Sequence, residues 1–210
     1  MKLLIIGATG GTGQELVKQA LEHGHIVTVL VRTPGKIKIV HDSLCVVKGD
    51  VLNYESVAKA VVGQEAVLSA LGHKKFFVRT SILSRGTENI MRAMNEQKVM
   101  RFICITSLGI NDSRFKLGLY YTLFVIPFIV FFYFRDKAKQ ERLIRESNLM
   151  WTIVRPGQMT NGKKRGTYKH GSNVGSYIFT RMISRADVAN FILTELSENR
   201  YLYKAPGIAY

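Results

Sequence analysis

Tyr133 and Lys137 form a pair of side chains whose types and spacing suit proton transfer. Residues four apart on a helix lie on one face. A tyrosine hydroxyl can give a proton to a developing alkoxide, and a nearby ammonium group assists by stabilising the phenolate that remains. Ser107, at the end of an apolar run, could orient a carbonyl group beside them. These three residues are candidate catalytic groups, although Tyr133 also belongs to an aromatic run and could equally pack in the core.

A glycine-rich turn near the start of the chain predicts a dinucleotide site. The turn is Gly7-Ala8-Thr9-Gly10-Gly11-Thr12-Gly13 and directly follows the apolar residues 3–6. A helix is expected to open near Gly13, and a second apolar strand follows at residues 25–31. This order lets the backbone approach a pyrophosphate, whose charge is stabilised by free N–H groups at the helix N-terminus. The expected cofactor-binding residues of the turn are Gly7, Thr9, Gly10, Gly11, Thr12 and Gly13.

The residue after the second strand narrows the choice of cofactor. It is Arg32, where an acidic residue would bind the ribose 2′-hydroxyl of NAD. An arginine can instead pair with the 2′-phosphate of NADP, and Lys36 with the hydroxyl of Thr33 could complete an anion site. These residues favour NADP(H) over NAD(H), although Arg32 and Lys36 could also be solvated loop charges.

Strand-like and helical patterns alternate along the rest of the chain. Strands are predicted at residues 44–48, 66–71, 101–106 and 150–154. One helix is predicted at 54–61, and a second begins after a cap at Thr80 or Ser81. A third begins at a capping box formed by Ser184 and Asp187 and continues through Leu193. Such alternation predicts an α/β fold, a single doubly wound parallel sheet of the Rossmann-like kind with helices on both faces. Residues 155–182 and 197–210 are expected to form a small C-terminal appendage on the substrate side of this one domain.

Ligands of a doubly wound sheet gather beyond the carboxyl ends of its strands. Asp50 and Val51 follow the third strand and are expected to contact the adenine ring. Further cofactor contacts are expected at the ends of the fourth and sixth strands, at Ala70, Leu71, Gly72 and Pro156. His73 could hydrogen-bond a ligand or could simply be a loop residue.

The composition favours one domain with a substantial core, since 47% of the 210 residues are hydrophobic. Cys45 and Cys104, far apart in apolar runs, predict buried reduced thiols rather than a disulfide or a metal site. The chain enters its first strand at once, which leaves no room for a signal peptide and makes the cytoplasm the expected location.

A net charge of +15 would attract phosphates, nucleic acids or anionic membranes. The basic residues are scattered, and their densest cluster, Lys163-Lys164-Arg165 with Lys169-His170, has no aromatic residues interleaved at stacking spacing. Because no recognition motif accompanies the charge, no specific nucleic-acid partner is expected. The expected partners are a phosphate-bearing cofactor and a small planar substrate.

Residues 117–134 carry no charge and are rich in aromatic side chains. Their length alone suits a transmembrane helix, but a span would place strands of one sheet on opposite sides of the bilayer, and Pro127 interrupts the run. The expectation is a helical segment that is buried or forms a homodimer contact. A peripheral membrane contact or a surface for an apolar substrate is the alternative.

Four motifs, in order along nearly the whole chain, resemble the NAD(P)H-binding atypical short-chain dehydrogenase/reductase family. They are residues 7–13, Gly49-Asp50-Val51, Thr106-Ser107 and Trp151-Thr152-Ile153-Val154-Arg155-Pro156-Gly157. Residues 29–32, 62–67 and 143–147 are similar to the flavin reductases of that family. The resemblance implies NADPH-dependent reduction of a flavin, FMN or FAD, or of another planar conjugated acceptor. It also implies an active-site role for Ser107 and cofactor roles for Gly7, Gly10, Thr12, Gly13, Arg32, Lys36, Asp50, Val51 and Gly72.

One position departs from that pattern. The flavin reductases carry a histidine after the proline that corresponds to Pro156, whereas this sequence has Gly157. The departure weakens a biliverdin-reducing function more than flavin reduction, which depends mainly on stacking and orientation.

Two other functions stay open at this stage. Tyr133 and Lys137 match the Tyr-x-x-x-Lys pair of the wider dehydrogenase superfamily, which indicates a carbonyl reductase. A nonenzymatic NADP(H) sensor similar to the NmrA-like regulators would instead use the apolar surface of residues 117–134 for a partner.

Overall fold

The strands form where short apolar runs rich in valine, isoleucine and leucine occur. In the computed structural model, which describes residues 1–73 and 77–210, these are β1 (Lys2–Ile6), β2 (Ile26–Val31), β3 (Leu44–Lys48), β4 (Ala66–Ser69), β5 (Arg101–Ile105) and β6 (Met150–Pro156). They pair in parallel in the order β3-β2-β1-β4-β5-β6. This is the strand order of a doubly wound dinucleotide-binding sheet, so the predicted α/β Rossmann-like fold is confirmed.

Short strands near the C-terminus extend this sheet and add a second one. β10 (Gly207–Ala209) pairs in parallel with β6, and β8 (Lys169–Gly171) pairs antiparallel with β10. β7 (Gln158–Thr160) and β9 (Met182–Ser184) form a separate two-stranded sheet. These short strands follow the carboxyl end of β6 and make up the small C-terminal addition that the sequence predicts.

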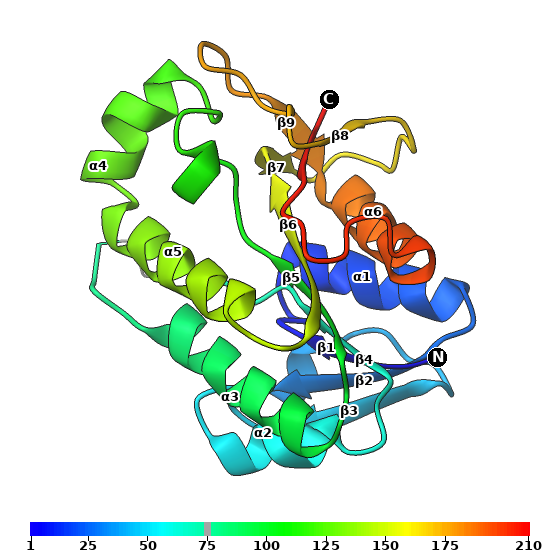
Figure 1. Ribbon diagram of the computed structural model, residues 1–210. Helices are drawn as coiled ribbons and strands as arrows, with labels where there is room; N and C mark the ends of the chain where they lie inside the picture. Colours follow the sequence, from blue (N-terminus) through cyan, green and yellow to red (C-terminus); the bar gives the residue numbers. More distant parts are fainter. Residues whose placement is uncertain (74–76) are drawn as a thin grey trace.

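The helices cover the two faces of the sheet in two groups (Figure 1). α1 (Gly11–Glu22) and α6 (Arg185–Glu198) pack together on one face, and α2 (Tyr54–Val61), α3 (Ile82–Glu96) and α5 (Phe131–Arg145) pack on the other. Alternate residues of β1 serve the two cores, with Leu3 and Ile5 facing one group and Leu4 and Ile6 facing the other. Both faces of β1 are buried, which explains why Leu3 to Ile6 are all apolar rather than alternating with polar residues.

Cys45 differs from the sequence prediction. Its side chain is exposed, because β3 is the outermost strand of its sheet and none of its residues is fully buried. Cys104 on the central strand β5 is buried as predicted, and burial raises the pKa of its thiol to about 12. The prediction of two buried thiols is therefore wrong for Cys45 and confirmed for Cys104.

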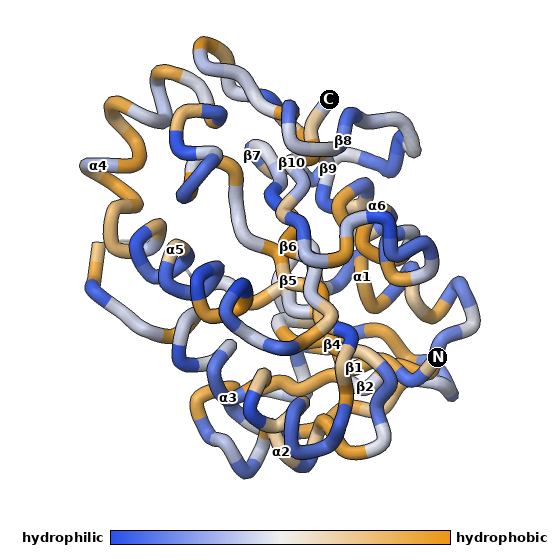
Figure 2. The backbone as a smooth tube through the Cα atoms, viewed as in Figure 1, coloured by the Kyte–Doolittle hydropathy of each residue, from blue (hydrophilic) through white to orange (hydrophobic). Residues whose placement is uncertain are grey.

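The uncharged segment 117–134 is not a buried helix. It consists of a π-helical turn η3 (Tyr121–Val125), a short α4 (Ile126–Phe128) and the start of α5. Its large side chains are exposed or half-buried, except for the buried Leu117. Figure 2 shows this apolar stretch at the margin of the molecule, away from the apolar strands. Within residues 1–73 and 77–210, no helix is both long enough and apolar enough to cross a membrane.

The sequence predicts the caps of two helices, and the structure places both N-cap residues there but bonds them differently. Ser184 Oγ accepts a hydrogen bond from the Asp187 backbone N–H at 3.0 Å, so α6 begins where the capping residues predict. Ser81 holds the N-cap position of α3 without a side-chain cap bond of its own. The carboxylate of Asp136, from α5, instead accepts from the backbone N–H groups of Leu83 at 2.9 Å and Ser84 at 3.2 Å. Ser81 is therefore the N-cap residue as predicted, but the capping hydrogen bonds come from a buried acidic side chain of another helix.

Replacement of Asp136 tests this cap. Asp136→Ala leaves two N–H groups at a buried helix end without their acceptor, and we expect the free energy of unfolding to fall by about 1–2 kcal/mol. Urea unfolding of Asp136→Ala and of the exposed control Asp42→Ala measures the effect. Equal stability of the two variants would contradict the cap.

Candidate dinucleotide site and neighbouring catalytic groups

Two glycines of the turn after β1 are required by the backbone itself. Gly7 has a φ of +82°, and a Cβ atom there would lie 2.4 Å from the carbonyl oxygen of Ala70. A Cβ atom on Gly13 would lie 2.2 Å from the carbonyl oxygen of Gly7. The turn can therefore pass between β4 and the first turn of α1 only if both positions lack side chains.

Gly10 is different, because the protein leaves room for a side chain there. Its backbone is extended, with φ −81° and ψ 159°, and an added Cβ would come no closer than 3.4 Å to its nearest neighbour, the Gly7 carbonyl oxygen. Among the described residues, none caps α1 with a side chain, and no acidic residue lies in its first turn. An open glycine beside an uncapped helix N-terminus fits a dinucleotide pyrophosphate that must approach the backbone closely.

Arg185 lies over this turn and was not expected from the sequence. A Cβ atom on Gly11 would be 2.7 Å from the Arg185 Cδ and 3.0 Å from its Nε. Its Nη1 donates to Asn161 Oδ1 at 2.6 Å, which holds the guanidinium beside the N-terminus of α1. Arg185 is the first residue of α6, and nothing in the local sequence connects that helix with the glycine turn. Only the packing of α6 on α1 brings the cation there.

The other residues expected in the turn have different surroundings. Thr9 and Gly10 are exposed, whereas Thr12 is buried and its hydroxyl donates to Met159 Sδ at 3.4 Å. The side chain of Thr12 therefore faces β7, and its backbone N–H is the part that lies in the first turn of α1. Arg32 follows β2 directly and is exposed, as is Lys36 in the short 3-10 helix η1 (Pro34–Lys36).

A hollow of about 250 Å³ joins this basic segment to the glycine turn. Its lining includes Ala8 of the turn, Gln14 of α1 and Lys36.

The two residues expected to contact the adenine ring lie after β3. Asp50 accepts a hydrogen bond from the Leu52 N–H at 3.0 Å, and the buried side chain of Val51 packs on Gly86.

The carboxyl ends of β4 and β5 bring the aromatic and cationic candidates together. The Tyr133 hydroxyl is 3.5 Å from the position of a Cβ on Gly72, and the rings of Tyr133 and His73 meet edge to face with centroids 4.9 Å apart. The Lys137 Nζ is 5.2 Å from the centre of the Tyr133 ring and donates to the Ile105 carbonyl at 3.4 Å. Ser107, two residues beyond Ile105, is partly buried. Tyr133, Lys137 and Gly72 thus share one site, and Lys137 is buried in it.

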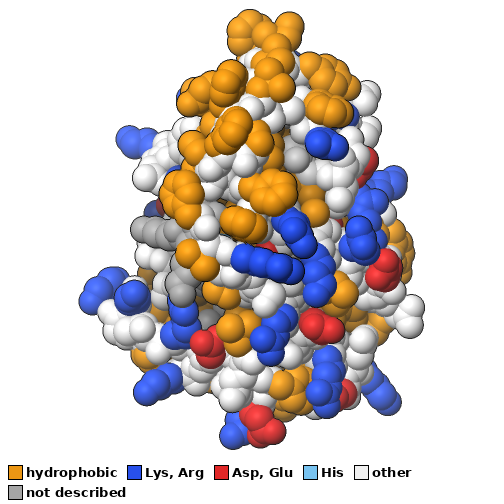
Figure 3. Space-filling model, turned by 90° about the vertical axis from the view of Figure 1, so that its left-hand side faces the viewer, with side chains coloured by type: hydrophobic (Ala, Val, Ile, Leu, Met, Phe, Trp, Pro, Cys, Tyr) orange, Lys and Arg blue, Asp and Glu red, His pale blue; other side chains and the backbone are white. Residues whose placement is uncertain are grey.

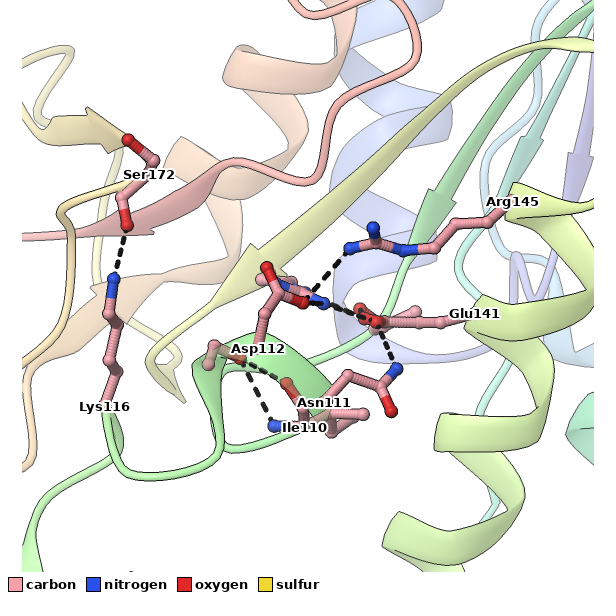
Figure 4. A network of polar contacts seen from close by, with 10 residues as sticks. Ile110, Asn111, Asp112, Lys116, Glu141, Arg145 and Ser172 are labelled. Atoms are coloured by element: carbon pink, nitrogen blue, oxygen red, sulfur yellow. Dashed lines mark hydrogen bonds and ion pairs between the residues drawn. The ribbon is translucent and has the colours of Figure 1, made fainter.

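Behind Ser107 a buried ion pair ties three elements together (Figure 4). Glu141 of α5 accepts from Arg155 of β6 through two bonds, Nε at 2.9 Å and Nη2 at 2.6 Å. The same carboxylate accepts from the Thr106 hydroxyl at 2.6 Å and from Asn111 Nδ2 at 2.9 Å. Glu141 and Arg155 are both nearly inaccessible to solvent, so the carboxylate is satisfied entirely by protein groups. Ser107 and its loop are held to α5 and β6 by these bonds.

Asp112 extends the network to the surface. Its carboxylate accepts from Arg155 Nη2 at 2.6 Å and from Arg145 Nη2 at 3.1 Å. The hydrogen bond from Arg155 is the main cause that holds the pKa of Asp112 below its usual range. The pKa of Arg155 is raised by Glu141 and Asp112, against the opposing effect of its burial.

Gly157, the departure from the flavin-reductase pattern, has a backbone explanation. A Cβ atom there would lie 2.4 Å from the carbonyl oxygen of Arg181. That carbonyl also accepts from the Gln158 N–H at 2.9 Å, where β7 and β9 begin to pair. A histidine therefore cannot occupy this position unless the β7–β9 sheet moves. Pro156, the last residue of β6, accepts from the Leu108 N–H at 3.1 Å and lies beside the Ser107 loop.

Comparison with known families agrees with this geometry. A family model described as NAD(P)H-binding matches residues 7–199. The chain belongs to this NAD(P)H-binding family.

The matched relatives differ widely in length. The chain is 29% identical over 178 residues to an uncharacterized chloroplastic protein of Arabidopsis thaliana, and 28% identical over 195 residues to protein TIC 62, chloroplastic, of Pisum sativum. These matches cover 79% and 82% of this chain but only 61% and 35% of the two relatives. The protein YwnB of Bacillus subtilis, uncharacterized, is 24% identical over 93% of this chain and 92% of its own length.

Solved structures share the fold at low identity. ChuY of Escherichia coli O157:H7, an anaerobillin reductase, has a TM-score of 0.82 at 21% identity, and the match covers 100% of this chain and 97% of that one. A short-chain dehydrogenase/reductase of Veillonella parvula in complex with NADP has a TM-score of 0.81 at 20% identity, with coverage of 100% and 94%. These likenesses show the fold, in agreement with the strand order.

Loss of the Glu141 charge tests the buried network. Glu141→Gln keeps the shape of the side chain but leaves Arg155 buried without its main counter-charge, so we expect the free energy of unfolding to fall by about 3–5 kcal/mol. The control Arg145→Gln removes an exposed partner of Asp112 and should cost less than about 1 kcal/mol. Denaturant unfolding of both variants measures the difference. A small effect of Glu141→Gln, equal to that of the control, would contradict an anchoring role for the pair.

Proposed function

We propose that this protein is an NADPH-dependent oxidoreductase that reduces a flavin or a similar planar conjugated acceptor. The observation that carries the cofactor assignment is the open Gly10 beside the uncapped N-terminus of α1, with Arg32 following β2. A pyrophosphate would lie against Gly10, Gly11 and the guanidinium of Arg185. Arg32 and Lys36 would receive the 2′-phosphate that distinguishes NADP from NAD.

The bound nicotinamide would supply a hydride. The contribution of this chain is to position the reactants and to bear charge. Gly72 and the edge of Tyr133 lie where the carboxyl ends of β4 and β5 meet, so a flat acceptor could stack there. Glu141 and Arg155 keep the Ser107 loop in place beside that position.

The choice of a planar acceptor rests on resemblance as well as on the site. The motifs resemble biliverdin reductase B, also called flavin reductase. The structural neighbour ChuY is named as an anaerobillin reductase, and two partial relatives are isoflavone reductase homologues of Nicotiana. All three names refer to conjugated ring systems. Since Gly157 cannot be replaced by histidine without moving the β7–β9 sheet, we place flavin reduction ahead of biliverdin reduction.

Carbonyl reduction is the second candidate, and one contact favours it. The buried ammonium of Lys137 lies 5.2 Å from the ring of Tyr133, a placement that would stabilise a tyrosine after it gives up its proton. In this function Tyr133 would donate the proton and Ser107 would orient the carbonyl.

Charge reversal at Arg32 tests the cofactor preference. Arg32→Glu replaces an attractive contact with a repulsive one, so we expect NADPH affinity to fall roughly tenfold to a hundredfold while NADH affinity changes little. Lys59→Glu, in the last turn of α2, makes the same change of charge away from the strand ends and serves as control. Fluorescence titration with both nucleotides measures the affinities. Equal binding of NADPH and NADH by the unaltered protein would overturn the assignment of NADP.

The acceptor is tested by following NADPH absorbance with FMN, a quinone and an aldehyde. For stacking-driven flavin reduction, Tyr133→Phe should retain most of the FMN turnover, within about threefold, because no proton from tyrosine is required. For carbonyl reduction, the same change should lower aldehyde turnover by about a hundredfold or more, and Ser107→Ala should lower it as well. Tight NADPH binding without turnover of any acceptor would reject both enzymes and favour the nonenzymatic, NmrA-like sensor.

A further inference from the structure

Two segments far apart in the sequence combine into one exposed apolar surface, which we call the apolar apex. The side chains that define it have between 58% and 75% of their surface exposed, and they are Tyr120, Phe124, Phe128, Tyr177, Ile178 and Phe179. The Leu119 N–H donates to the Ile178 carbonyl at 3.2 Å, and the Thr180 hydroxyl donates to the Leu117 carbonyl at 3.0 Å. The two segments are therefore bonded to each other and present their aromatic side chains together.

The surroundings of the apolar apex are basic. Arg114 lies over the ring of Phe115 at 5.5 Å, and Arg181 directly follows the second segment. Arg79, Arg135 and Lys139 line one hollow together with Phe132 and the buried Asp136. Figure 3 shows hydrophobic side chains crowding the upper part of this face, with Lys and Arg side chains beneath them. We call these five exposed cations the basic rim.

Acidic residues are missing from the stretches that build this face. The sequence holds no aspartate or glutamate between Ser113 and Arg135, and none between Ser147 and Ala186. Asp136, which follows Arg135, is buried and accepts from the N–H groups of Leu83 and Ser84. The exposed charges of the apex and its rim are therefore positive, within a molecule whose net charge is +15. A surface of this kind attracts an anionic partner and repels another copy of itself.

We infer that the apolar apex is a membrane-docking surface, by which the protein lies on a bilayer that contains anionic lipids. Phenylalanine and tyrosine side chains favour the boundary between headgroups and acyl chains, and a rim of Lys and Arg binds the lipid phosphates. A second copy would have to bring two basic rims together, so charge favours the bilayer over a dimer.

The inference does not depend on the proposed function, but it would place the candidate site near the lipid. α5 begins at Phe131, next to the apex, and carries Tyr133 in its first turn and Lys137 in its second. A docked protein would hold these residues close to the membrane surface. Docking itself is measured without cofactor or acceptor.

Vesicle binding of the full chain tests the inference. We expect the protein to co-sediment with vesicles of mixed phosphatidylglycerol and phosphatidylcholine, to bind vesicles of phosphatidylcholine alone far more weakly, and to lose affinity as salt rises from about 0.1 M to about 0.5 M. The double variant Phe124→Ser with Phe128→Ser should lower the partition coefficient roughly a hundredfold. Arg135→Glu with Lys139→Glu should lower it roughly tenfold or more and remove the preference for anionic vesicles.

The control removes exposed apolar side chains elsewhere. Val40→Ser with Val62→Ser, in the loop before β3 and at the end of α2, should leave vesicle binding unchanged. Thermal unfolding and NADPH titration of every variant confirm that the fold is kept. Absence of binding to anionic vesicles, or binding that Phe124→Ser with Phe128→Ser leaves intact, would overturn the inference. A wild-type dimer that these two changes convert to monomer, together with no vesicle binding, would overturn it in favour of self-association.

Discussion

The close approach of three backbone segments at the end of β1 is the constraint around which the molecule is arranged. Gly7 passes against the carbonyl of Ala70 and Gly13 passes against the carbonyl of Gly7, at distances that no side chain would allow. These contacts place the first turn of α1 against the end of β1 and the residue that follows β4, and no side chain of the described residues caps that turn. Of the four glycines of the turn, Gly10 is the one where a side chain would meet no close neighbour, so this position is open and suited to a ligand. Dinucleotide binding is thus a consequence of how the central strands and α1 meet.

A second constraint acts on the other side of the site. The buried pair of Glu141 and Arg155 joins α5, β6 and the loop after β5, and Asp112 of that loop adds ion pairs to Arg155 and Arg145 at the surface. Removing two charges from water is costly, and here every oxygen of the carboxylate accepts hydrogen bonds from protein groups. The pair therefore specifies where the Ser107 loop lies relative to Tyr133 and Lys137. Glu141 follows Lys137 by one helical turn, so one face of α5 supplies both the anchor and the candidate catalytic groups.

The C-terminal addition shapes the site by exclusion. Pairing of β7 with β9 brings the carbonyl of Arg181 so close to residue 157 that glycine is required there. Arg185, at the start of the helix that follows β9, reaches back over the glycine turn. The same addition contributes Tyr177 to Phe179 to the apolar apex. This part of the chain thus affects residue 157, the glycine turn and the apolar apex.

Local sequence was sufficient for the parts that depend on nearest neighbours along the chain. The strands, the glycine turn, the cap at Ser184 and the basic residue after β2 follow from the period of apolar residues and from the backbone freedom of glycine. Contacts between distant segments could not be obtained in this way. Asp136 caps α3 from another helix, Arg185 lies over Gly11 from another helix, and Cys45 is exposed because its strand is outermost. The apolar composition of residues 117–134 does not tell whether they are buried or exposed. They lie at the surface because of the path that the chain takes beyond the sheet. Sequence alone determined the fold and the class of cofactor, whereas the tertiary structure decided which charges meet and which apolar side chains stay uncovered, because those outcomes depend on packing between segments that local patterns do not relate.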